Sequence, residues 1–210
     1  MNNLLDFFQE LDKNKIEYVV WKNCNLIQNF FEENENLDIY INLTNKEICK
    51  SLLKEKFWIE VRSTTNNHKN INHYIYICDD KIYNIHIYFR LISGNSITKN
   101  YDFTNLYNLF ENKVFDSQNK LWIMDYNLQL ELFKIRLACK HKSLLGSFLI
   151  YRDLNNYINE FNLLTKHSNS KVSFTYSEIK INEKKINFNN KNDSNLILNQ
   201  IKNYKRFNEY

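Results

Sequence analysis

The stretch Ile16-Glu17-Tyr18-Val19-Val20-Trp21-Lys22-Asn23 has the pattern of an apolar strand that ends in a small polar turn. Twelve residues further on comes Asn36-Leu37-Asp38-Ile39-Tyr40-Ile41, and the residues between the two have the pattern of a short helix. Alternate residues of a strand face the same side, so Asn36 and Asp38 share one face of the second strand. This order of strand, polar turn, helix and acidic strand predicts an α+β fold with a polar site built on the two strands.

Composition limits the class of protein. The chain has 210 residues, 43% of them hydrophobic, with 14 Tyr and 15 Phe, which suits one main domain with a helical appendage. The net charge of +4 comes from scattered basic residues, so charge alone does not indicate a nucleic-acid footprint. No apolar run reaches the length of a membrane span. The acidic, amphipathic N-terminal segment is unlike a signal peptide, and we expect a cytoplasmic protein without membrane insertion.

Cysteine and glycine usage excludes several kinds of site. The four cysteines are isolated from one another, which favours reduced structural thiols over a disulfide framework or a zinc site. Gly94 and Gly146 are the only glycines of the sequence. The sequence therefore has neither the glycine-rich loop of a P-loop protein nor the dinucleotide-binding fingerprint.

Hydrophobic periodicity predicts the order of elements. Helices are expected at 3–13 and 26–31, and a third helix is expected to open at a Thr44–Glu47 capping box and to run to about 54. Strands are expected at 16–21, 37–43 and 57–62. A hairpin is expected with arms at 74–78 and 82–91 and a turn at 79–81. From 103 onward the pattern is helical, apart from an extended piece at 121–124. The helices expected in this part are 128–142, 148–164 and 195–207. We expect a core at 1–120, a helical subdomain at 121–165, and an Asn/Lys-rich linker or hairpin with a terminal helix at 166–210.

Asp38 and Asn36 are the candidate metal ligands. Oxygen-bearing side chains at positions i and i+2 of a strand put two ligands for a divalent ion on one face. Mg²⁺ prefers hard oxygen ligands, so Asp38 suits it well, whereas the neutral carbonyl of Asn36 is a weaker ligand. The alternative is that Asp38 is a solvated charge on the polar face of a half-exposed strand.

Three further residues could act in the same site. Asn84, His86, Tyr88 and Arg90 share one face of the second hairpin arm. His86 could ligate a metal or act as a general base, and Arg90 could hold a phosphate through its planar fork. Lys22 could supply a point charge to a phosphate. The alternative for each is an ordinary surface residue. Most aromatic residues suit the core, but Tyr40 and Tyr88 lie on the polar faces of their strands.

Several short motifs occur together, in this order: Trp21-Lys22-Asn23, Asn36-Leu37-Asp38, His86-Ile87-Tyr88-Phe89-Arg90-Leu91, Gly94 and Lys99-Asn100-Tyr101. Over residues 4–155 the chain resembles small nucleotidyltransferase-fold proteins (DNA polymerase beta-like, minimal nucleotidyltransferases) of bacterial surface-polysaccharide gene clusters. The family pattern has Trp-Lys-Ser in the turn and Asp-Leu-Asp on the strand, so this chain departs from it at Asn23 and Asn36.

The resemblance implies a fold, a site and a function. The fold would be a mixed sheet with flanking helices, followed by a helical C-terminal subdomain. Asp38 and His86 would be catalytic, Asp38 and Asn36 would hold Mg²⁺, and phosphate would be bound by residues Lys22, Asn23, Arg90 and Lys99. The enzyme would transfer NMP from an NTP to a small phosphorylated or hydroxylated precursor of capsule or other surface polysaccharide. Two alternatives are a toxin-like nucleotidyltransferase acting on tRNA or protein, and a catalytically degenerate nucleotide-binding or interaction protein.

Overall fold

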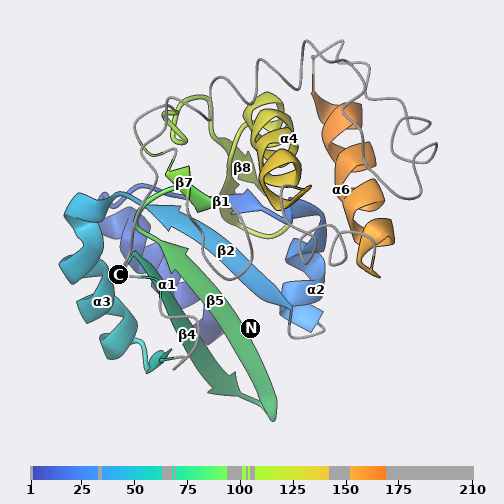
Figure 1. Ribbon diagram of the computed structural model, residues 1–210. Helices are drawn as coiled ribbons and strands as arrows, with labels where there is room; N and C mark the ends of the chain where they lie inside the picture. The colour runs from blue at the N-terminus through green and yellow to red at the C-terminus, as the bar shows by residue number, and fades with distance from the viewer. Residues whose placement is uncertain are drawn as a thin grey trace. The chain divides into compact units, whose positions relative to one another are not determined.

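The computed structural model describes residues 2–32, 35–62, 68, 70–93, 101–102, 104, 107–141 and 152–168 (Figure 1). The chain forms two compact units, Met1–Leu91 with Tyr107–Asp125 and Ile92–Leu106 with Tyr126–Tyr210. The helix expected at 195–207 lies outside the described residues, and so does the linker or hairpin expected at 166–193, apart from residues 166–168. No helix in the described part of the chain is long and apolar enough to cross a membrane.

The first unit is built on a seven-stranded sheet in the order β3-β4-β5-β2-β1-β9-β8. Its strands are β1 Tyr18–Lys22, β2 Asn36–Ile41, β3 Ile59–Val61, β4 Ile71–Cys78, β5 Lys81–Tyr88, β8 Val114–Asp116 and β9 Leu121–Ile123. Strand β2 runs antiparallel to β1 and parallel to β5, and β1 runs parallel to β9. The sheet is therefore mixed and flanked by helices, which confirms the predicted α+β class.

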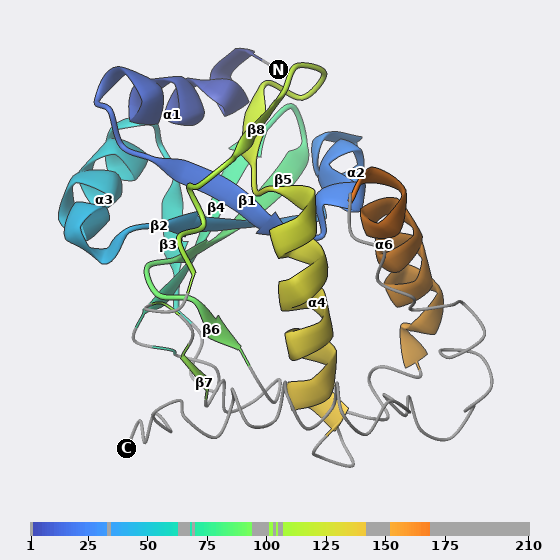
Figure 2. The same ribbon diagram turned by 90° about the horizontal axis from the view of Figure 1, so that it is seen from above.

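Helices cover one face of this sheet. They are α1 Asn2–Lys13, α2 Ile27–Glu32 and α3 Lys46–Glu55, with short 3-10 turns η1 Cys24–Leu26 and η2 Leu43–Asn45. Figures 1 and 2 show α1 on the side of the sheet that faces away from the viewer in Figure 1. The Phe8 ring of α1 lies 5.4 Å from that of Tyr18, and Phe7 lies 6.2 Å from Trp58 after α3. The apolar stripe of α1 thus packs on the face of the sheet that carries Tyr18.

The hairpin of β4 and β5 has the turn expected for its length. Asp79 and Asp80 both have positive φ, 51° and 59°, as two-residue hairpin turns require when their twist matches that of the strands. This turn fixes the register, in which Cys78 pairs with Lys81 and His73 with His86. Strand β4 begins at Ile71, three residues earlier than predicted, and β5 ends at Tyr88, before the predicted Leu91.

Two predictions about local structure are wrong. The Thr44 amide bonds to the Asn42 side chain at 3.1 Å, so Asn42 caps η2, and Thr44 does not cap α3. Residues 107–120 form turns and β8 in place of the expected helix. The extended piece predicted at 121–124 is correct, and as β9 it pairs with both β1 and β8.

The second unit contains the two helices described for the C-terminal part, α4 Tyr126–His141 and α6 Leu154–His167, and a two-stranded sheet of β6 Ile92–Ser93 and β7 Tyr101–Asp102. The helices pack through a small apolar core of Leu130, Phe133, Leu137, Phe161 and Leu164. A buried pair, Arg136 and Glu160, joins them through two N–O contacts of 3.0 and 3.3 Å. This pairing satisfies both charges inside the helix–helix contact.

Candidate active site

A β-bulge places Lys22 opposite Asp38. Strand β1 pairs Val20 with Ile39, and the register then shifts by one residue so that Lys22 pairs with Asp38. Without the shift Lys22 would stand opposite Leu37, on the helix-covered side of the sheet. A bulge inserts one residue, here Trp21, and redirects the side chain that follows. The bulge therefore brings a cation to the face that carries Asp38.

The parallel pairing of β2 with β5 places His86 beside Asp38. The two residues are Cα partners in the register, and His86 Nδ1 lies 3.2 Å from Asp38 Oδ1. Lys22 Nζ lies 3.3 Å from the same carboxylate oxygen. Lys22, Asp38 and His86, which come from three neighbouring strands, thus meet at one carboxylate. We call them the Lys22–Asp38–His86 cluster.

Aromatic side chains surround the ammonium group of Lys22. Lys22 Nζ donates a hydrogen bond to the Tyr88 hydroxyl at 2.8 Å. It also lies 4.7 Å from the centre of the Tyr88 ring and 5.0 Å from that of Trp21, and these two rings pack edge to face. Ring faces attract cations, so both contacts hold the ammonium group beside Asp38.

His73 extends the cluster on the far side of His86. The two imidazole rings lie 4.2 Å apart between centroids at an angle of 63°, because β4 and β5 pair these residues directly. Contact with Asp38 through Nδ1 orients His86, so its Nε2 is the ring nitrogen directed away from the carboxylate. An imidazole oriented by a carboxylate is the usual arrangement of a histidine general base.

The cluster is more buried than predicted. The Asp38 side chain is 5% exposed and that of Lys22 is 15% exposed, so the picture of Asp38 as a solvated charge on a half-exposed strand is wrong. Strand β2 is central in the sheet, and nearly all of its residues are buried. On the site's side of the sheet, Phe110 packs against Tyr40 at 5.4 Å. A segment that the sequence pattern presents as helical thus covers part of the face that carries Asp38.

The Tyr40 and Tyr88 pair is also buried, at 5% and 3% exposure. Tyr88 supplies a hydrogen-bond acceptor to Lys22. Tyr40 is a packing residue beneath Phe110. Of this pair, Tyr88 therefore belongs to the site and Tyr40 to the packing of the sheet.

Asn23 performs the conformational task of a glycine in the turn after β1. Its φ and ψ are 56° and 32°, in the left-handed region, and the 3-10 turn of η1 starts at the next residue. Asparagine tolerates this region better than most residues. The replacement of a small turn residue by Asn23 is thus compatible with the sharp exit from β1. Its expected contact with phosphate stays a prediction.

The other predicted residues stand further from the cluster or outside the described part. Asn36 is exposed, at the first position of β2, on the side that carries Asp38. Arg90 is partly exposed and follows the last paired residue of β5, so strand alternation does not define its direction. Lys99 lies outside the described residues.

His73 was missed because the predicted hairpin arm began at Tyr74. The signal was available: a two-residue turn at Asp79 and Asp80 sets the pairing of the whole hairpin and places His73 opposite His86. The role of Trp21 could not be read from alternation, since it depends on the bulge.

The donor set suits a divalent ion only in part. Among the described residues, no group of three or more His, Cys, Asp or Glu side chains could hold a metal ion. Asp38 is one carboxylate, and Lys22 already contacts one of its oxygens. Mg²⁺ bound mainly by a triphosphate and by water can, however, be held by a single protein carboxylate. The residues therefore fit a cation that arrives with a nucleotide.

No protein-family model, curated protein or solved structure matches this chain. The geometry of the Lys22–Asp38–His86 cluster and the motifs of the sequence are therefore the features that bear on function.

Proposed function

We propose that the first unit binds a nucleoside triphosphate with Mg²⁺ and transfers the NMP group to a small phosphorylated or hydroxylated acceptor. The convergence of Lys22, Asp38 and His86 on one carboxylate carries this proposal. The order of elements supports it: an apolar strand, a left-handed polar turn, a helix, and a second strand with an acidic residue. A further strand beside it carries the histidine, as the resemblance to nucleotidyltransferase-fold proteins implies.

Each residue of the cluster has a role in this reaction. Asp38 would hold the cation that comes with the triphosphate, and such a cation, when bound, would offset the charge that develops on the leaving pyrophosphate. Lys22 contacts a phosphate oxygen as a point charge. For a hydroxyl acceptor, His86 Nε2 takes the proton as the acceptor oxygen bonds to the α-phosphorus and the bond to the pyrophosphate oxygen breaks. Asp38 keeps the His86 ring oriented through Nδ1.

The biological setting is proposed from the resemblance alone. The acceptor would be a precursor of capsule or other surface polysaccharide, and the reaction would take place in the cytoplasm.

One observation favours a second candidate function, the binding of a nucleotide without turnover. Asp38 is the only carboxylate in the described cluster, and it is already neutralised by Lys22 at 3.3 Å. Asn36, at the position of a second acidic residue in the family pattern, carries no charge. A site with one engaged carboxylate would hold a cation weakly.

Calorimetric titration with each NTP, with and without Mg²⁺, tests binding, and pyrophosphate release with candidate sugar phosphates tests turnover. We expect Asp38→Asn to weaken Mg²⁺-dependent binding at least about tenfold, equivalent to 1.4 kcal/mol. Asp80→Asn, at the exposed hairpin turn, is the matched control and should bind like the wild type. Binding without pyrophosphate release would favour the second candidate. Absence of NTP binding would refute both.

A further inference from the structure

An uncharged apolar patch lies on strands β3, β4 and β5 of the first unit, where it adjoins His73, the neighbour of His86. Ile59 and Val61 of β3, Ile75 and Ile77 of β4, and Ile82 of β5 belong to it, and we call these residues the isoleucine patch. The register pairs Ile59 with Ile75 and Ile77 with Ile82, while Val61 pairs with His73. Directly paired residues of antiparallel strands point to the same side. All five therefore lie on the face of the sheet that carries His86 and Asp38.

This face is the one that should be polar. On the opposite face of the same strands, Tyr74 and Ile85 are buried, and Trp58 packs on Tyr76 at 5.3 Å. An antiparallel sheet with one face on the core normally carries polar residues on the other. Here Ile59, Ile77 and Ile82 are 52%, 57% and 47% exposed, and Val61 is 41% exposed. The alternation of these strands is thus apolar on both sides.

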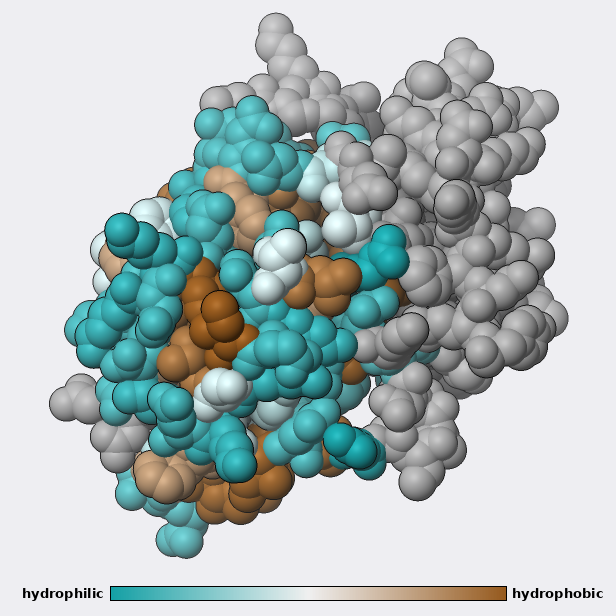
Figure 3. Space-filling model, turned by 90° about the vertical axis from the view of Figure 1, so that its left-hand side faces the viewer, coloured by the Kyte–Doolittle hydropathy of each residue, from teal (hydrophilic) through white to brown (hydrophobic). Residues whose placement is uncertain are grey.

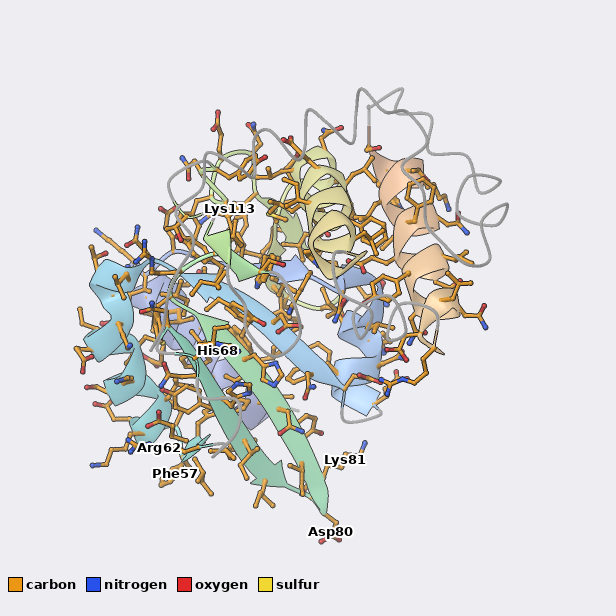
Figure 4. All side chains as sticks on the ribbon, in the orientation of Figure 1. Phe57, Arg62, His68, Asp80, Lys81 and Lys113 are labelled. Carbon is orange, nitrogen blue, oxygen red and sulfur yellow. The ribbon has the colours of Figure 1, made fainter. Side chains whose placement is uncertain are left out.

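An exposed aromatic residue precedes β3 in a strained conformation. Phe57 is 81% exposed and has a φ of 62°. Phe57 follows the end of α3, where the Trp58 amide donates a hydrogen bond to the Leu53 carbonyl. At such a helix end, the left-handed position that Phe57 occupies usually carries glycine. Figure 4 shows Phe57 at the outer side of the sheet, and Figure 3 shows apolar side chains exposed among polar ones on the side of the molecule that carries α3. Solvent contact gives no reason for a bulky residue here.

The exposed area is sufficient for an interface between two copies. Four Ile and Val side chains that are about half exposed offer roughly 300 Å², already in the range of the largest apolar patch of a typical monomer. A largely exposed Phe adds roughly 150 Å². Two such surfaces packed face to face would bury roughly 900 Å² of apolar surface, and the surrounding polar rim would bring the total above the roughly 1,000 Å² of a biological interface.

The rim of the patch carries charges of both signs. The Arg62 side chain, next to Val61, is 80% exposed and lies 3.8 Å from the Glu60 carboxylate, which belongs to the opposite face of β3 from Ile59 and Val61. Asp79 and Asp80 are exposed at the turn that joins Ile77 to Ile82. Figure 4 shows Arg62 beside the sheet and Asp80 at the hairpin tip. A two-fold axis through an uncharged patch that has a basic residue on one side and acidic residues on another can bring opposite charges of the two copies together.

We propose that a second copy of this chain packs face to face on the isoleucine patch to form a two-fold symmetric dimer. The patch is uncharged, large enough for a self-interface, and edged by charges of both signs. This inference does not depend on the proposed nucleotidyl transfer.

Sedimentation velocity of the full chain from about 1 to about 100 μM, a range that spans weak to moderate association, tests the proposal. We expect the wild type to reach twice the monomer mass. Ile77→Lys and Ile59→Lys should each weaken dimerisation at least tenfold, because each buries an unpaired charge in the interface. Val114→Lys is the control, since Val114 is 39% exposed on β8 at the other edge of the sheet, and it should dimerise like the wild type.

Ile77→Thr, which keeps a β-branched side chain, serves as a second variant if the lysine substitutions prevent folding; it too should weaken dimerisation. A wild type that stays monomeric at the highest concentration overturns the proposal. This holds even if the patch then proves to bind apolar vesicles or another protein. An equal effect of Val114→Lys and the patch variants overturns it as well.

Discussion

Asp38→Ala should destabilise the first unit, in contrast to the small effect expected of a solvated strand residue. The substitution removes the carboxylate that contacts both Lys22 Nζ and His86 Nδ1. Lys22 would keep the Tyr88 hydroxyl and the neighbouring ring faces, none of which carries a compensating charge. With a side chain that is 15% exposed, Lys22 would be left as a nearly buried cation that has lost its ion pair with Asp38.

The magnitude follows from the burial of the two partners. Removing one partner of a fully buried ion pair costs about 3–5 kcal/mol, and exposed pairs contribute about 0–1 kcal/mol. The Asp38 side chain is 5% exposed, near the buried limit, and Lys22 retains some access to water. We therefore expect a loss of about 2–3 kcal/mol in the free energy of unfolding, between these limits. Adding Lys22→Met should recover at least about 1 kcal/mol of it, because the two residues are in contact.

Urea denaturation followed by tryptophan fluorescence measures this loss. Trp21, Trp58 and Trp122 all belong to the first unit, so the signal reports on the unit that contains Asp38. Glu47→Ala is the control: Glu47 is 83% exposed and lies 3.6 Å from Lys50, and its removal should cost about 0.5 kcal/mol or less. If Asp38→Ala costs no more than Glu47→Ala, or if Lys22→Met adds a further independent loss, the ion pair does not stabilise the fold and the reasoning is refuted.

Three other outcomes are expected. Asn36→Asp adds a second carboxylate to the side of β2 that carries Asp38, and should tighten Mg²⁺-dependent nucleotide binding in calorimetry; unchanged affinity would show that Asn36 is not near the cation. Burial raises the pKa of the Cys49 thiol to about 12, so at pH 8 almost no reactive thiolate forms. Mass spectrometry should find that iodoacetamide labels the partly exposed Cys24 and Cys78 first and labels Cys49 only when the protein unfolds. Early labelling of Cys49 would contradict this. Asp80→Gly removes a Cβ from a residue with a φ of 59° and should stabilise the hairpin by up to about 1 kcal/mol, and a loss of stability in urea would show that the Asp80 side chain supports the turn.

The sequence predicted the elements of the site better than its surroundings. Clean alternation in the second strand and in the second hairpin arm gave the faces of Asp38 and His86, and the structure pairs the two residues directly. Alternation is reliable here because a slip of one residue would turn the apolar set of each strand away from the helices. The parallel pairing of the two strands depends on long-range packing, and strand alternation does not predict it.

The burial of Asp38 could not be predicted from its strand. An alternating pattern has the same appearance whether its polar face meets solvent or another segment. The segment that meets it contains Phe110, which contacts Tyr40, and its spacing of apolar residues favoured a helix. Lys22 was predicted beside Asp38, but plain alternation from Val20 would have directed it to the other face. Only the bulge at Trp21 reconciles the strand with the site.

The engagement of Asp38 with Lys22 sets a condition on any reaction at the cluster. A nucleoside triphosphate is strongly anionic, whereas Lys22 and Asp38 cancel one another at 3.3 Å. In the proposed reaction, a cation carried by the nucleotide would add positive charge to the site. Under the proposed function, Asp38 would contact that cation in place of Lys22, and the Lys22 ammonium group, which donates a hydrogen bond to the Tyr88 hydroxyl, would contact a phosphate oxygen. The same pair that stabilises the empty fold would thus exchange partners on binding, and the free energy of breaking it would reduce the affinity for the nucleotide.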